Sequence, residues 1–152
     1  MLNRRDLLAH SSKVAALLAT AGLLPQAAHA AYNAQAFDAK SMAELMKALG
    51  GNAPVESKDV SVTAPDIAEN GAVVPITVAT TLPGAKRLLV LVEKNPNVMS
   101  ALFEVSDAVD ASFATRVKMG QSSNVYSVAM MSDGKVFFAQ KEVKVTLGGC
   151  GG

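Results

Sequence analysis

From Pro54 onward, apolar residues recur at every second position, the spacing that places side chains on one face of a β-strand. Val60 and Val62 alternate with polar residues. The same alternation returns over residues 74–78, where Pro75 indicates a strand that lies at an edge or begins there. Residues 88–92 are apolar at every position, as is typical of a strand covered on both faces. The pattern therefore predicts a mainly β fold.

Turn signals divide the remaining β pattern into short segments. Asn95-Pro96-Asn97 ends the apolar run, and Ser132-Asp133-Gly134 is typical of a three-residue hairpin loop. Further strands are predicted over residues 102–105, 113–119, 125–131, 135–139 and 143–147. Seven or eight short strands, with turns roughly every 8–12 residues, are the pattern of an immunoglobulin-like β-sandwich.

One short helix precedes the strands, at about residues 38–49. Its apolar residues recur at helical spacing: Phe37, Met42, Leu45, Met46 and Leu49. Ser41 and Glu44 form a candidate capping box, with Asp38 as a competing N-cap, and Gly50-Gly51 predicts the C-terminal end.

The first 30 residues have the features of an export signal. Arg4-Arg5 precedes an apolar run over residues 14–24, and Ala28-His29-Ala30 is a typical cleavage site. The run of about 11 residues is too short for a membrane span, which needs roughly 20. The adjacent arginines predict the twin-arginine route, which exports folded proteins, and hence a periplasmic location. An ordinary secretory signal is the alternative.

Residues 31–147 then form a single predicted domain. Without Arg4, Arg5 and Lys13, the 14 basic residues become 11, and without Asp6 the 13 acidic residues become 12. This balance does not indicate binding to nucleic acid or to an anionic membrane. Arg116 and Lys118 are interpreted as a solvated strand face, with a partner-docking stripe as the alternative.

The sequence beyond the signal has few groups for self-contained catalysis. Both histidines lie in the signal, so no Cys-His or Ser-His pair and no histidine-ligated metal site can form in the domain. The methionines could suggest copper(I), but most occupy core-facing positions, which favours packing. We therefore expect no cofactor, no metal and no enzymatic activity of the chain's own.

The chain's single cysteine lies in the C-terminal segment 148–152, which we call the arm: Gly148, Gly149, Cys150, Gly151 and Gly152. Glycine restricts the backbone least, so the arm is expected to be flexible and to present the thiol to partners. An ordinary thiol has a pKa of about 8.5 and needs a base or a cation for activation. None stands beside Cys150 in the sequence, so a covalent carrier is favoured over a catalyst.

Several segments resemble the SoxY family, the sulfur-carrier subunits of the bacterial thiosulfate-oxidising (Sox) system. The most specific is the C-terminal segment 141–152, which includes the arm. Residues 93–97, 115–119 and 132–135 and the twin-arginine leader are similar to that family too. Val98 departs from the family, which often has a second proline there.

The resemblance implies an immunoglobulin-like fold and a heterodimer with SoxZ, a second β-sandwich subunit. It implies that Cys150 holds sulfur intermediates derived from thiosulfate. The haem protein SoxAX would attach thiosulfate, SoxB would hydrolyse off sulfate, and a sulfane dehydrogenase would oxidise the remaining sulfur. The four glycines of the arm would let it enter each active site in turn.

Two other classes of function remain as alternatives. A ubiquitin-like carrier would use its C-terminal Gly-Gly as a thiocarboxylate, but the predicted export and the single early helix argue against it. An exported β-sandwich that serves only as an interaction module would carry an idle or disulfide-forming thiol at Cys150.

Overall fold

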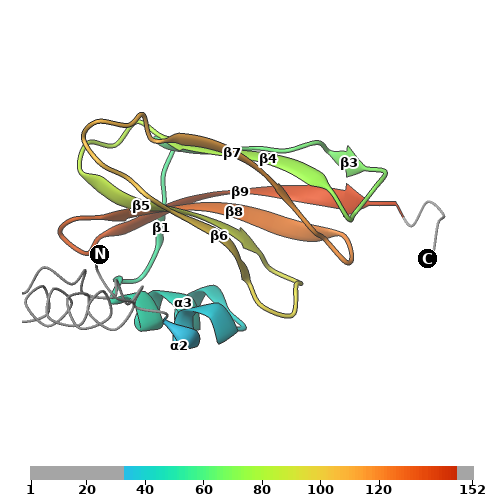
Figure 1. Ribbon diagram of the computed structural model, residues 1–152, viewed down its shortest axis with the longest axis horizontal. Helices are drawn as coiled ribbons and strands as arrows, with labels where there is room; N and C mark the ends of the chain where they lie inside the picture. The colour runs from blue at the N-terminus through green and yellow to red at the C-terminus, as the bar shows by residue number, and fades with distance from the viewer. Residues whose placement is uncertain (1–32, 147–152) are drawn as a thin grey trace, which may run out of the picture. The chain divides into compact units, whose positions relative to one another are not determined.

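The computed structural model describes residues 33–146, which fold as two β-sheets and two short helices (Figure 1). The helices are α2 (Ala34–Asp38) and α3 (Met42–Leu49). The strands are β1 (Val55–Glu56), β2 (Val60–Thr63), β3 (Ile67–Ala68), β4 (Val74–Thr80), β5 (Ala85–Val92), β6 (Met99–Glu104), β7 (Ser112–Val117), β8 (Ser123–Met131) and β9 (Val136–Val145).

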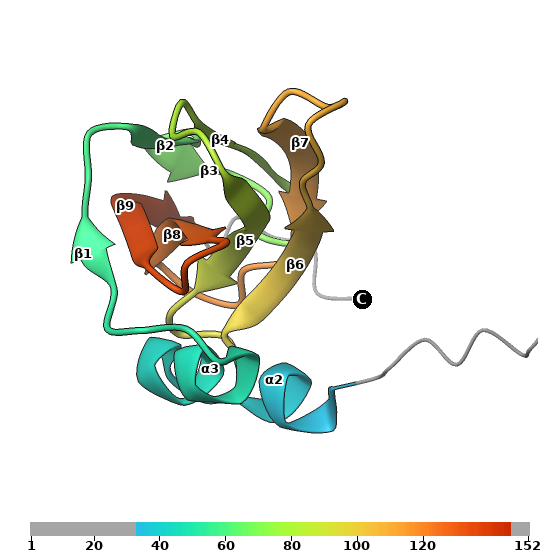
Figure 2. The ribbon, with the colours of Figure 1, turned by 90° about the vertical axis from the view of Figure 1, so that its left-hand side faces the viewer.

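The two sheets stack face to face, and the helices cover the outer face of the larger one (Figure 2). The larger sheet has the strand order β1-β9-β8-β5-β6, with β3 also pairing with β9. The smaller sheet has the order β2-β4-β7. This mainly β architecture confirms the predicted sandwich.

Strand β5 separates the two cores of the molecule. Leu88, Val90 and Val92 face the smaller sheet, whereas Leu89 and Leu91 face the helices, and all are at most 1% exposed. Because side chains alternate across a strand, only a strand covered on both faces can bury such a run. The prediction made from the apolar run over residues 88–92 is confirmed.

Two aromatic rings close the side of the sandwich between β6 and β7. Phe103 stacks on Phe113 with 4.5 Å between ring centroids and an interplanar angle of 3°. The pair joins the edge strands of the two sheets, which are not hydrogen-bonded to each other.

Pro75 is the second residue of β4, as expected for a proline near the start of a strand. It pairs with Arg116 of β7, while the pairing with β2 begins only at Thr77. The alternative of an edge strand is wrong, because β4 is the central strand of its sheet.

The prediction of one helix at about residues 38–49 is wrong in part, because α3 begins only at Met42 and a second helix, α2, precedes it. Ala39 is extended (φ −57°, ψ 133°), and its carbonyl accepts a hydrogen bond from the Val98 N–H at 3.1 Å. Ser41 then caps α3 by accepting from the Glu44 N–H at 3.2 Å, as predicted. Asp38 ends α2 instead of capping α3, and Phe37 is 46% exposed instead of lying on the apolar face.

The strands predicted over residues 135–139 and 143–147 are one strand. β9 is continuous from Val136 to Val145 and pairs with β8 along residues 136–143. The two-residue strands β1 and β3 were not predicted, and both pair with β9 in parallel, near its opposite ends.

Candidate functional site

The predicted site residues Gly148, Gly149, Cys150, Gly151 and Gly152 lie outside the described residues. What the structure describes is the strand that carries them. β9 ends at Val145, and Thr146 follows it, four residues before Cys150. The local geometry of residues 144–146 therefore fixes the point from which the arm leaves the domain.

Backbone and side-chain groups hold the end of β9 on both sides. On one side, the N–H of Lys144 donates to the Asp66 carbonyl at 2.9 Å, and the N–H of Thr146 donates to the Ala68 carbonyl at 3.1 Å. On the other side, the N–H of Val145 donates to the Ser122 hydroxyl at 2.9 Å. We call these three holding residues (Asp66, Ala68 and Ser122) the root clamp. The clamp gives the arm a fixed origin.

An ion pair adds to the clamp on the β3 side. Lys141 Nζ lies 2.9 Å from an Asp66 carboxylate oxygen and also donates to the Ala64 carbonyl at 2.6 Å. The Asp66 side chain is 89% exposed, so the ion pair itself contributes little, on the order of 0–1 kcal/mol. Its effect is to orient the segment 64–66 along β9.

A close backbone contact at Gly71 completes the support of the arm's origin. The Gly71 carbonyl accepts from the Met119 N–H at 2.7 Å. A Cβ at Gly71 would lie against the Met119 carbonyl oxygen and 2.8 Å from Val145 Cγ1. No other residue type fits without movement of the loop or of β9.

Gly71→Ala is therefore expected to lower the free energy of unfolding by about 1–3 kcal/mol, the usual cost of overpacking. The matched control is Gly120→Ala, where a Cβ would meet no atom within 4 Å. This control should change the free energy by less than about 0.5 kcal/mol. Urea unfolding followed by circular dichroism measures both, and equal values for the two variants would contradict the tight contact.

The sequence did not predict the root clamp. Asn70-Gly71 is a typical turn dipeptide and could have indicated a tight backbone position. Nothing in the pattern singles out Ser122 or Ala68, because both act through pairing with residues far away in the sequence.

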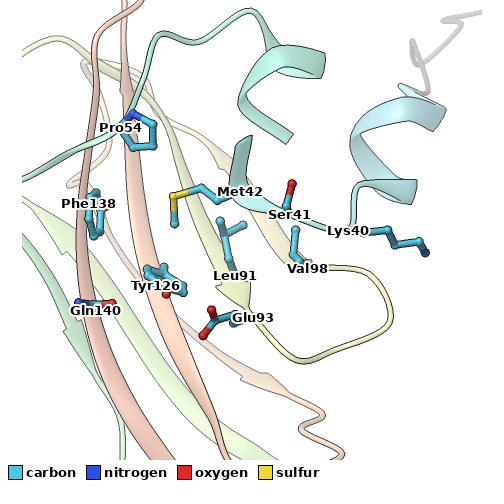
Figure 3. Close-up of a pocket in the computed structure, with 10 residues that line it drawn as sticks. All are labelled: Lys40, Ser41, Met42, Pro54, Leu91, Glu93, Val98, Tyr126, Phe138 and Gln140. Carbon is cyan, nitrogen blue, oxygen red and sulfur yellow. The ribbon is translucent and has the colours of Figure 1, made fainter. Parts of the chain in front are cut away.

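A pocket of about 480 Å³ opens between α3 and the outer face of the larger sheet (Figure 3). Its apolar wall includes Met42, Leu91, Tyr126 and Phe138, and the last two rings lie 6.0 Å apart. Burial raises the pKa of the Tyr126 phenol, and the nearby Glu93 carboxylate raises it further. The Lys40 side chain points away from the pocket in Figure 3, and its ammonium group donates to the Asn97 side-chain oxygen at 2.5 Å.

On its β9 side, the pocket lies farther from Thr146 than the extended arm can reach. Gln140, which lines the pocket, precedes Thr146 by six residues, about 20 Å along a strand. Cys150 follows Thr146 by four residues, a reach of at most about 14 Å.

Within residues 33–146, no group of three or more His, Cys, Asp or Glu side chains is arranged to hold a metal ion. In the same part of the chain, no helix is long and apolar enough to cross a membrane. Arg116 and Lys118 are both exposed at the end of β7, as a solvated strand face and a partner-docking stripe both require.

The chain is similar in sequence and in structure to known sulfur oxidation proteins. The sequence model of the family described as "Sulfur oxidation protein SoxY" matches residues 45–150, a range that includes Cys150. The structure of the sulfur carrier protein SoxY from Chlorobium limicola f thiosulfatophilum is 38% identical, with a TM-score of 0.56. That match covers 62% of this chain and 84% of the other. No curated protein matches the sequence.

More distant structures share the fold alone. A structure of superoxide reductase (neelaredoxin) from Ignicoccus hospitalis is 16% identical with a TM-score of 0.51, covering 57% of this chain and 79% of the other. A second structure of that protein also has 16% identity and a TM-score of 0.51, covering 72% and 91%. At this identity the likeness describes only the sandwich architecture.

Proposed function

The chain belongs to the SoxY family of sulfur oxidation proteins, and from this premise we propose that Cys150 covalently carries sulfur derived from thiosulfate. Membership of the family gives the chain a sulfur-carrier role in the Sox system. The main support for Cys150 as the attachment site is the range of the family match. The family model matches residues 45–150 and so includes the only cysteine of the chain.

The loading step joins two sulfur atoms. The Cys150 thiol loses its proton, a bond forms between Cys150 Sγ and the outer sulfur of thiosulfate, and two electrons leave. The products are Cys150–S–S–SO₃⁻ and one proton. The two electrons would pass to a haem partner of the SoxAX type, which is the oxidant of this step.

Later partners would act on the same sulfur atom. Hydrolysis by a SoxB-like enzyme breaks the bond between sulfur and the sulfonate group, adds water, and releases sulfate and a proton, leaving Cys150–S–SH. A sulfane dehydrogenase would oxidise the outer sulfur. Each step would take its catalytic groups from the partner, since no base or cation stands beside Cys150 in the sequence.

The same proposal includes the partner subunit and the compartment. The chain would form a heterodimer with a SoxZ-like β-sandwich and be exported folded to the periplasm by the twin-arginine signal of residues 1–30. Folded export would carry along a partner that lacks its own signal.

Mass spectrometry tests the carrier role directly. The heterodimer is incubated with thiosulfate and the haem partner, and the C-terminal peptide is then analysed without reduction. The expected result is a mass increase equal to one S₂O₃ unit on Cys150, which is lost again on reduction. Omitting the haem partner is the control and should leave the thiol unmodified.

An unmodified Cys150 in a system that consumes thiosulfate would contradict the proposal. That result would favour the alternative of an exported interaction module with an idle thiol.

A further inference from the structure

Two strongly exposed apolar side chains lie in the segment next to the origin of the arm. Large apolar side chains that are strongly exposed in residues 33–146 are Phe37, Val55, Ile67, Val73 and Val109. Of these, Ile67 is 58% exposed and Val73 is 49% exposed, and both lie in the segment that supports the end of β9. Exposure of such side chains costs solvation free energy and is typical of contact surfaces when they occur together.

The pairing pattern places both residues beside the arm. Ile67 of β3 is in register with Lys144, two residues before Thr146. Val73 ends the turn that begins at Asn70, whose carbonyl accepts from the Val73 N–H at 3.3 Å. The same turn contains Gly71, which contacts Val145 closely. Figure 1 shows β3 and this turn at the end of the sandwich where β9 ends.

The other two exposed valines lie at the opposite end of the strands. Val55 of β1 is in register with Phe137, near the start of β9. Val109 lies in the loop between β6 and β7, where the Val109 N–H donates to the Ser106 carbonyl at 3.1 Å. The exposed fractions are 58% and 48%, almost the same as those of Ile67 and Val73.

The length of the arm requires an enzyme to approach the end that carries Ile67 and Val73. Cys150 can extend at most about 14 Å from Thr146, whose position the root clamp fixes. Enzyme sites are usually recessed in clefts. The rim of such a cleft must therefore come into contact with the surface from which the arm leaves before the thiol reaches the reacting group.

We propose that Ile67 and Val73 are the docking surface for the enzyme that loads the arm, and that they bind an apolar rim around that enzyme's cleft. This inference rests on the proposed function and adds its contact surface. Charges of both signs flank the surface, with Asp66 and Glu69 against Lys141 and Lys144. Apolar contact, rather than a field of one sign, would therefore determine the docking. A small contact area fits a carrier that must leave each enzyme again.

The experiment compares two double variants that are matched in exposure and in local structure. Ile67→Asp with Val73→Asp places charges beside the arm, and Val55→Asp with Val109→Asp places them at the opposite end. Each pair alters one residue of a two-residue strand on β9 and one loop residue. The measurement is kcat/KM for loading of Cys150 by the haem partner, with the heterodimer as substrate.

The variant beside the arm is expected to lose about tenfold or more in kcat/KM, mainly through KM, because it removes the burial of two apolar side chains. The variant at the opposite end should stay within about twofold, as for surface changes away from a contact. Alkylation of Cys150 by iodoacetamide and co-purification with the partner subunit should be unchanged in both. A milder pair, Ile67→Thr with Val73→Thr, keeps the β-branched shape and should give a smaller loss in the same direction.

Equal loading of both double variants and the wild type would overturn the docking surface and leave the carrier role standing. Loss of the partner subunit from the Ile67 and Val73 variant alone would also overturn it, because the surface would then be the heterodimer interface. Binding of the Cys150→Ser form to the haem partner is measured by surface plasmon resonance. Because this form cannot be loaded, the measurement tests the docking surface independently of the carrier role. A lower affinity on adding Ile67→Asp and Val73→Asp supports docking even where no sulfur is transferred.

Discussion

Cys150→Ser is expected to abolish sulfur loading completely while leaving the domain folded. A serine hydroxyl cannot form the sulfur–sulfur bond of the carrier intermediate, and the chain has no second cysteine to replace it. The substitution lies beyond the last described strand, so the melting temperature should not change measurably. Thiosulfate-dependent electron transfer in the reconstituted system and the mass of the C-terminal peptide measure the effect.

The position of the thiol can be separated from its presence by a second variant. Adding Thr146→Cys to Cys150→Ser restores one exposed thiol, held at the end of β9 by the hydrogen bond to Ala68. This thiol should react with iodoacetamide but should not be loaded, because it cannot enter a cleft. Turnover by the Cys150→Ser chain would contradict the carrier role, and loading at position 146 would contradict the need for an arm.

Deleting Gly148 and Gly149 is expected to reduce loading by more than about 100-fold. The deletion removes about 7 Å of reach from a thiol that extends at most about 14 Å beyond Thr146. Misplacement by even 1 Å can cost a catalysed reaction about 100-fold. The rate of Cys150 alkylation by a small reagent should stay the same, because that reagent needs no cleft. Single-turnover loading followed by mass spectrometry gives the comparison.

The control for the deletion keeps the length and changes the side chains. Gly148→Ser with Gly149→Ser keeps the contour length, and serine-rich and glycine-rich linkers behave alike. Loading should fall by only a few-fold, on the order of the lost freedom of two glycines. If the deletion and the serine pair load equally, the thiol must react at the surface of its partners.

The parts of the fold that the sequence predicts are those in which local pattern and tertiary environment agree. The apolar run of β5 needs cover on both faces, and the helices and the smaller sheet provide it. Ser41 and Gly50 end α3 as their side-chain and backbone chemistry require, with Gly50 in the left-handed region at φ 74°.

The incorrect predictions concern segments whose structure depends on contacts with groups far away in the sequence. The Val98 N–H binds the Ala39 carbonyl and separates α2 from α3, and no local pattern indicates that contact. Residues 140–142 are all polar and separate the two strands predicted in this region. Gln140 and Glu142 are exposed positions of one continuous strand, and Gln140 lines the pocket beside α3.

The sequence likewise predicts one part of the candidate site and not the other. Cys150 and its glycines are visible in the sequence because residue type alone gives them their chemistry. The root clamp is not visible, because Ala68 contributes a carbonyl group, which every residue has. Ser122 contributes a hydroxyl whose partner lies 23 residues away.

The continuity of β9 also determines how the carrier responds to mechanical load. Under the proposed function, a force that withdraws the arm from a partner in line with β9 would act on Thr146 along the axis of a ten-residue strand. Its bonds to β8 run perpendicular to that axis along residues 136–143, and β1 and β3 add bonds on the other side. A pull in this direction shears all of these bonds together instead of opening them one at a time. If the proposed function holds, such a load would leave the strand to which the arm is attached paired along its whole length.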